Sequence, residues 1–111
     1  MTHDVAEMLG HSMPFSTQYV VDQSGASIRQ LNHWIKKGWL EPKEYGGSGT
    51  QREWSKKELD VANLMARMLR AGLDVKRAAK VARLIVDNPD PAKTKRFIRL
   101  GEGIWLVVEM T

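Results

Sequence analysis

The segment of the chain that most limits its fold is GASIRQLNHWIKKGWLEP, at residues 25–42. Ser27 is placed to cap a helix over 27–37, and Gly38 followed by Pro42 ends it. Apolar residues recur at the spacing of one buried helical stripe: Ile28, Leu31, Trp34 and Ile35. The opposite side is polar and basic, with Arg29, His33, Lys36 and Lys37 at its centre and Gln30 and Asn32 on its shoulders. The sequence therefore predicts a short helix that carries long polar donors over an apolar underside.

A glycine-rich loop, GGSG at 46–49, follows between short extended segments at 43–45 and 51–54. The loop is short and flanked by Tyr45 and Trp54, which favours a small β-wing over a flexible linker. A phosphate-cradling P-loop is disfavoured, because no Lys-Ser or Lys-Thr pair follows at the required spacing. A basic helix followed by a small basic loop is typical of a winged helix-turn-helix, whose helix enters the major groove while the loop lies along the phosphates. Double-stranded DNA is therefore the predicted partner.

The positive charge of the chain is concentrated over the same segment. The whole chain carries 17 Lys or Arg against 13 Asp or Glu, and residues 26–57 carry seven against three. A basic excess over the reading elements is the electrostatic footprint expected for DNA binding. Charge alone is equally compatible with an ordinary solvated surface. The DNA prediction therefore rests on the helix and the wing together.

Composition argues against several other classes of protein. There is no cysteine, so a disulfide or a thiolate metal site is not possible. His3, His11 and His33 share neither a helical face nor a loop, and no catalytic grouping occurs at a plausible spacing, so no metal, cofactor or enzyme activity is expected. No apolar run approaches the roughly 20 residues of a membrane span, and no signal-peptide profile is present. We expect a cytoplasmic, nucleoid-associated protein without membrane contacts.

The N-terminal part of the chain predicts a tail and one short helix. Residues 1–14 lack periodicity and are expected to be a flexible tail. Ser16 is placed to cap a helix over 17–24, and Gly25 ends it. The side chains expected to turn inward from this helix are Tyr19, Val20 and Gln23.

Two longer helices are predicted after the wing. Ser55 and Glu58 form an S-x-x-E capping box that opens a helix extending to Arg70. One apolar face of this helix consists of Leu59, Ala62, Met65, Ala66 and Leu69. A second apolar face, which is either core under the C-terminal segment or a dimer seam, consists of Val61, Leu64 and Met68. Asp74 caps the next helix, 75–87, which Pro89 and Pro91 end. Its predicted buried arc is Val75, Ala78, Ala79, Ala82 and Ile85, and its polar arc is Lys76, Arg77, Lys80 and Arg83.

The last segment changes to the two-residue period of β-structure. KRFIRL, GEG and IWLVVEM indicate two strands joined by a glycine turn. The second strand is apolar on both faces over 104–108, so as a free edge it would invite aggregation. The hairpin therefore packs on its own helices or pairs with another chain. Because isolated hairpins are marginal and two-fold symmetry suits DNA half-sites, we expect a homodimer.

In the order and spacing of its motifs, the chain resembles the MerR-like (mercury-resistance regulator) DNA-binding family over residues 16–87. The residues that carry the resemblance are Gly25, Ser27, Leu31, Trp34, Gly38, Leu40 and Pro42, then Arg52, Trp54 and Ser55, and finally Ala71-Gly72-Leu73-Asp74. Asn32 stands where members usually carry Arg, and Lys36 and Lys37 are possible substitutes. Typical members continue into a long dimerising helix and an effector domain. Only a hairpin is predicted here, so no small-molecule effector is expected.

Together these observations predict a mainly α fold with small β elements. A winged helix-turn-helix of four helices and a short β-wing spans 15–88, and a C-terminal β-hairpin spans 92–111. The predicted function is specific binding of double-stranded DNA by a small bacterial or phage transcription regulator that acts as a repressor. The residues expected at the DNA are Ser27, Arg29, Gln30, Asn32, His33, Lys36, Lys37, Lys43, Tyr45, Ser48, Thr50, Gln51 and Arg52.

Several alternatives stay open at this point. Arg52 is expected to clamp a phosphate, with an ion pair to Glu44 or Glu53 as the competing interpretation. Trp34, Trp39 and Trp54 are expected to pack in the core and not to stack on bases. An excisionase-like architectural factor that bends DNA for recombination would use the same domain. A protein-interaction module on a reused winged-helix fold is the third possibility.

Overall fold

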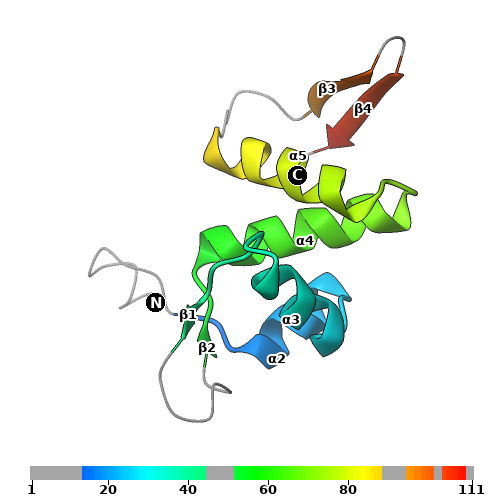
Figure 1. Cartoon of the computed structure of the whole chain (residues 1–111). Helices are drawn as coiled ribbons and strands as arrows, with labels where there is room; N and C mark the ends of the chain where they lie inside the picture. Colours follow the sequence, from blue (N-terminus) through cyan, green and yellow to red (C-terminus); the bar gives the residue numbers. More distant parts are fainter. Residues whose placement is uncertain (1–13, 45–51, 89–94, 102–103, 110–111) are drawn as a thin grey trace.

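The computed structural model describes residues 14–44, 52–88, 95–101 and 104–109. Its helices are α2 (Thr17–Ser24), α3 (Ile28–Lys36), α4 (Lys56–Arg70) and α5 (Val75–Asp87). Two antiparallel strand pairs accompany them, β1 (Lys43–Glu44) with β2 (Arg52–Glu53) and β3 (Lys95–Gly101) with β4 (Ile104–Glu109). This arrangement confirms the predicted mainly α fold with a wing and a C-terminal hairpin (Figure 1). Of the predicted tail over 1–14, residues 1–13 lie outside the described residues, as do the prolines at 89 and 91.

A polar side chain caps the start of each described helix. Each capping oxygen accepts a hydrogen bond from the backbone N–H three residues later, and the caps are Ser16, Ser27, Ser55 and Asp74. Gly25 ends α2 with a φ of 80°, in the left-handed region that glycine adopts without strain. The four predicted helix starts are therefore confirmed.

The central element of the fold is α4, against which both α2 and α5 pack. The largest fully buried side chains come from every layer of the domain: Val20, Leu31, Trp34, Leu40, Trp54, Val61, Met65 and Ile85. Trp54 also ties the start of the chain to the wing, because its backbone pairs with Phe15 through two bonds of 2.8 Å and its indole N–H donates to Thr17 Oγ1. Trp34 and Trp54 are core residues, as predicted, and Trp39 is half-buried against the same core.

Three side chains predicted to be buried are exposed instead. Tyr19 is 41% exposed and stacks on Phe15 with ring centroids 4.9 Å apart, and Gln23 faces solvent. Ile28 is 48% exposed. In α2 the core contact goes to Val20 and Ser24, and α3 meets the core only after its first turn, through Leu31 and Trp34. A helical stripe therefore overstates burial in these two short helices, because only part of each stripe meets the core.

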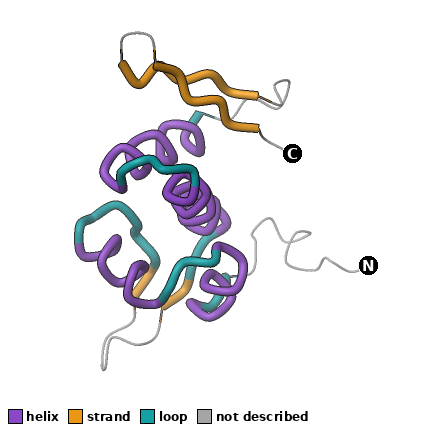
Figure 2. Tube along the Cα trace, turned by 90° about the vertical axis from the view of Figure 1, so that its right-hand side faces the viewer, coloured by secondary structure: helices purple, strands orange, loops and turns teal. Residues whose placement is uncertain are grey.

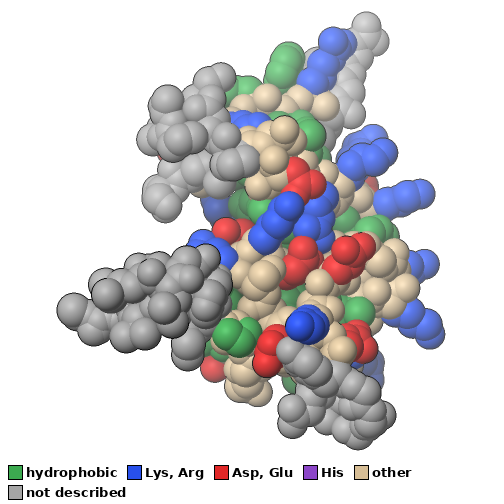
Figure 3. All heavy atoms as spheres, turned by 90° about the vertical axis from the view of Figure 1, so that its left-hand side faces the viewer, with side chains coloured by type: hydrophobic (Ala, Val, Ile, Leu, Met, Phe, Trp, Pro, Cys, Tyr) green, Lys and Arg blue, Asp and Glu red, His purple; other side chains and the backbone are tan. Residues whose placement is uncertain are grey.

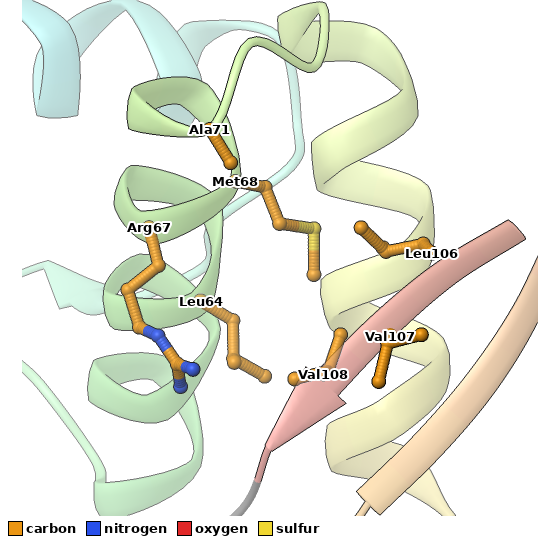
Figure 4. A pocket seen from close by; sticks show the side chains of 7 residues that line it. All are labelled: Leu64, Arg67, Met68, Ala71, Leu106, Val107 and Val108. Carbon is orange, nitrogen blue, oxygen red and sulfur yellow. The ribbon is translucent and has the colours of Figure 1, made fainter.

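The C-terminal hairpin lies against Leu64 and Met68 of the second apolar face of α4. Val108 is buried at 5% exposure, and Ile98 and Leu106 are partly buried against the core. Figure 4 shows the side chains of Leu64 and Val108 meeting between α4 and β4. A small pocket of about 90 Å³ remains along this seam, lined by Leu64, Arg67, Met68, Ala71, Leu106, Val107 and Val108. Of the two alternatives for this face of α4, core under the hairpin is the one that the structure adopts.

Polar contacts fix the hairpin in place. The guanidinium of Arg67 donates to the backbone carbonyl of Glu109 at 3.2 Å, and that of Arg96 donates to the carbonyl of Asn88 at 2.9 Å. The hairpin lies at one end of the helical layers, and β1 and β2 lie at the other end (Figure 2).

Candidate nucleic-acid interface

The exposed side of α3 carries a row of long polar and basic side chains. Arg29, Asn32, His33, Lys36 and Lys37 are all exposed. The same helix is anchored from below, by Leu31 at 0% and Trp34 at 2% exposure. A helix that is rigidly held on one side and lined with donors on the other can enter the major groove as one unit.

Two of the residues predicted at the DNA hold the start of α3. Ser27 Oγ accepts from the backbone N–H of Gln30 at 3.0 Å, and Gln30 Oε1 accepts from the backbone N–H of Ser27 at 2.9 Å. These two bonds form a complete capping box. The Gln30 side chain retains its amide N–H₂ group as a donor. The predicted DNA contacts of Ser27 and Gln30 stay predictions, and the observed role of this pair is to fix the N-terminus of the helix.

Arg52 connects the wing to α3. Its Nη1 donates to Asn32 Oδ1 at 2.6 Å, and its Nε lies 3.4 Å from Glu44 Oε2 across the β1–β2 pair. The Arg52 side chain is only 18% exposed. The ion pair with Glu44, the competing interpretation of Arg52, is therefore present. Asn32 is the acceptor that makes this link.

A buried ion pair supports the exit from α3. Arg83 of α5 donates to both carboxylate oxygens of Glu58 at 2.7 and 2.9 Å and to the carbonyl of Trp39 at 2.9 Å. Glu58 Oε1 also accepts from the backbone N–H of Glu41 at 2.8 Å. The segment that follows α3 is thus held by α4 and α5 together.

This arrangement corrects two sequence-based expectations. Glu58 does not return to Ser55, so no reciprocal capping box forms there, because Arg83 and the N–H of Glu41 take its carboxylate. Arg83, predicted on the polar arc of α5, does not face open solvent, since its side chain is only 29% exposed. The sequence could not distinguish these two roles of Glu58, because the S-x-x-E spacing is the same whether Glu58 returns to Ser55 or binds Arg83.

The electrostatics of Glu58 reflect this environment. Burial raises the pKa of the Glu58 carboxyl, but the hydrogen bond from Arg83, the backbone N–H of Glu41 and the Arg83 charge outweigh burial. The net effect is a pKa below the ordinary value. The Glu58 carboxylate therefore stays charged at neutral pH, and the hydrogen bond to it raises the pKa of Arg83.

The remaining predicted residues belong to the wing and to the end of α3. Lys43 is exposed on β1, at the position paired with Glu53. His33 meets the edge of Trp39, with ring centroids 6.2 Å apart. The predicted contacts Tyr45, Ser48, Thr50 and Gln51 lie outside the described residues. Figure 3 shows Lys and Arg side chains projecting along the right-hand edge of one face, with acidic side chains nearer its middle.

The described part of the chain offers little for other kinds of site. Within these residues there is no group of three or more His, Asp or Glu side chains that could hold a metal ion. None of the described helices has the length and apolar character needed to cross a bilayer. The polar, basic side of α3 with the adjacent wing is thus the feature of the described structure that suggests a binding function.

A capped, basic helix packed beside a two-stranded wing defines the class of helix-turn-helix DNA-binding proteins. The family model for MerR helix-turn-helix regulatory proteins matches residues 15–84, more than half of the chain. The chain belongs to this family, which makes it a DNA-binding transcription regulator. A comparison with curated proteins finds no match.

Proposed function

We propose that this protein binds a specific duplex DNA site through α3 and the wing and represses transcription from it, in a bacterium or a phage. The observation that carries the proposal is the two-sided build of α3. Its exposed side holds Arg29, His33 and Lys36, while its buried side is fixed by Leu31 and Trp34. In this proposal α3 reads base edges, the wing lies along the backbone, and the protein acts at the nucleoid as a homodimer without a small-molecule effector.

Arg29 is the side chain best placed to read a base. It is exposed near the start of α3, in the part of a recognition helix that usually contacts base edges. An Arg that binds a guanine edge through two hydrogen bonds contributes about 1–3 kcal/mol of discrimination. Arg29→Ala should therefore weaken binding to the cognate site by that amount and relax specificity at one base pair.

The matched control keeps the charge and removes the forked geometry. Arg29→Lys should restore affinity for random DNA, because it restores the phosphate attraction, but it should not restore the preference for the cognate base pair. The site is first located by footprinting on the DNA that flanks the gene. The affinities are then measured by fluorescence anisotropy over a series of salt concentrations. Equal weakening by Arg29→Ala on cognate and random DNA would make Arg29 a phosphate contact.

The same footprint separates the proposal from its alternatives. Operator binding predicts one or two spaced half-sites. An excisionase-like architectural factor predicts arrays of adjacent sites and bent DNA. A protein-interaction module would show no salt-dependent affinity for DNA, whereas each phosphate contact of a DNA-binding protein adds roughly 0.9 to the slope of log K against log salt.

A further inference from the structure

The hairpin has a second face that the described part of the chain leaves open. Its inward side chains pack on the helical domain, and they are Ile98, Leu106 and Val108. Its outward side chains include Phe97 at 64%, Trp105 at 58% and Val107 at 50% exposure. These are three of the six large hydrophobic side chains that are exposed among the described residues. They lie together on one face, at the end of the molecule opposite the wing (Figure 2).

The strand register gives this face an internal order. The outward cross-strand pairs are Lys95 with Glu109, Phe97 with Val107, and Arg99 with Trp105. Each pair joins two complementary partners: a cation with an anion, two apolar side chains, and a cation with an aromatic ring. The Lys95 ammonium lies 3.7 Å from Glu109 Oε2, and both side chains are more than half exposed.

This order makes the face complementary to itself. A two-fold axis between two such faces, parallel to the strands, lays β3 of one copy over β4 of the other. Every outward residue then meets the residue that pairs with it within its own hairpin. Lys95 faces Glu109 of the second copy, Phe97 faces its Val107, and Arg99 faces its Trp105 ring. Two sheets packed at about 10 Å keep their strands within about 30° of each other, which allows this match.

The alternative two-fold axis, perpendicular to the strands, is less favourable. It lays β3 over β3 in reverse, so that Lys95 faces Arg99 of the second copy. Two like charges are then placed together on each side of the axis. The charges of the hairpin thus favour one closed arrangement.

The area of the face is adequate for a weak dimer. An aromatic side chain offers roughly 150–250 Å², so Phe97, Trp105 and Val107 together expose on the order of 350 Å² per chain. Two copies bring on the order of 700 Å² of apolar surface together, and the charged rim extends this toward the roughly 1,200 Å² at the low end of specific interfaces. We propose that the outward face of the β3–β4 hairpin binds the same face of a second copy of this chain, through a two-fold axis parallel to the strands. This inference depends on the proposed function only for the expectation that the protein is a homodimer.

Charge reversal tests both the surface and the register. In the two-fold arrangement, Lys95→Glu places two acidic side chains opposite each other on both sides of the axis, and Glu109→Lys does the same with two basic ones. Each variant alone should raise the dissociation constant of the dimer roughly tenfold or more, because like charges across an interface cost several kcal/mol. An equimolar mixture should dimerise again, since each Glu at position 95 or 109 of one chain then meets a Lys of the other. The pair inside each hairpin stays like-charged in the mixture, so the recovery cannot come from repair of the hairpin itself.

The assay is sedimentation velocity of the full chain without DNA, from about one to one hundred micromolar. Val107→Glu, at the centre of the face, should abolish the dimer. Leu84→Glu is the matched control, since Leu84 is also 50% exposed but lies on α5, and it should leave the dimer unchanged. Circular dichroism establishes that each variant is folded.

Three results would overturn the proposal. They are a wild-type chain that stays monomeric at one hundred micromolar, open-ended association beyond a dimer, and a charge-reversal mixture that does not recover. A monomeric wild-type chain would mean that the outward face of the hairpin binds a different protein. Because sedimentation is measured without DNA, failure of the dimer is distinguishable from failure of DNA binding, which anisotropy measures on the same protein.

Discussion

Replacement of Glu58 by Gln is the sharpest test of the ion pair that holds the segment after α3. The change keeps the shape of the side chain and removes its charge. Glu58 is only 8% exposed, and it accepts two hydrogen bonds from the Arg83 guanidinium and one from the backbone N–H of Glu41. The neutral amide of Glu58→Gln has one acceptor oxygen in place of two, so Arg83 loses at least one charge-assisted bond.

The expected magnitude follows from these contacts. A hydrogen bond to a charged group contributes about 1.5–3 kcal/mol, so loss of both Arg83 bonds would cost about 3–6 kcal/mol. One acceptor oxygen remains, and the Arg83 side chain is 29% exposed and can bind water. We therefore expect Glu58→Gln to lower the free energy of unfolding by about 2–3 kcal/mol, which lies below the 3–5 kcal/mol of a fully buried pair. For a domain of this size the loss corresponds to about 10–15 °C in Tm.

Urea unfolding followed by tryptophan fluorescence and circular dichroism measures this loss. Asp60→Asn is the matched control, because it breaks the Lys56–Asp60 ion pair on the exposed side of the same helix. An exposed pair of this kind contributes about 0.5 kcal/mol or less. A Glu58→Gln loss no larger than that of Asp60→Asn would refute the idea that the buried pair stabilises the fold.

The pH dependence gives a second, independent readout. The pKa of Glu58 is lowered in the folded protein, so the stability that it contributes is present above its unfolded pKa of about 4.3. This stability is lost as the pH falls through the lower, folded pKa. The difference between wild type and Glu58→Gln should therefore be constant near neutral pH and shrink below about pH 4.3. A difference that grows on acidification would contradict the assignment.

Three further changes test particular contacts. Arg52→Ala should weaken DNA binding because it releases the wing from Asn32, while the slope of log K against log salt stays nearly unchanged because Glu44 already neutralises the guanidinium. In anisotropy titrations, a slope reduced by about 0.9 would show instead that Arg52 contacts a phosphate. Ser27→Ala should lower the free energy of unfolding, measured in urea, by about 1 kcal/mol because the helix cap is lost. An unchanged free energy of unfolding would show that the capping box does not stabilise the fold. Gly25→Ala should lower Tm more than Gly38→Ala. Both glycines have a positive φ, but of the two only Gly25 would place a Cβ 3.2 Å from another side chain, that of Arg70. Equal decreases in Tm would show that backbone strain is the sole effect.

The starts and ends of the helices could be predicted from the sequence because local chemistry decides them. Ser16, Ser27, Ser55 and Asp74 each satisfy an orphan backbone N–H within their own first turn, wherever the helix later packs. The change from a helical to a two-residue period likewise predicts the C-terminal hairpin, since it depends only on neighbouring residues. The family resemblance follows from the same local motifs, and the matching family model confirms it.

The tertiary structure decided which polar groups meet across the fold. Glu58 is a cap by its local pattern, yet 25 residues separate it from Arg83, the partner that takes its carboxylate. Arg52 and Asn32 are 20 residues apart, and only the docking of the wing on α3 brings them together. Helical periodicity gives the direction of a side chain but not the extent of the surface that covers it, which is why Ile28 and Tyr19 are exposed. The covering of α4 by the hairpin, which leaves Phe97, Trp105 and Val107 outward, is decided by the same long-range packing, because a strand apolar on both faces is compatible with either side facing the core.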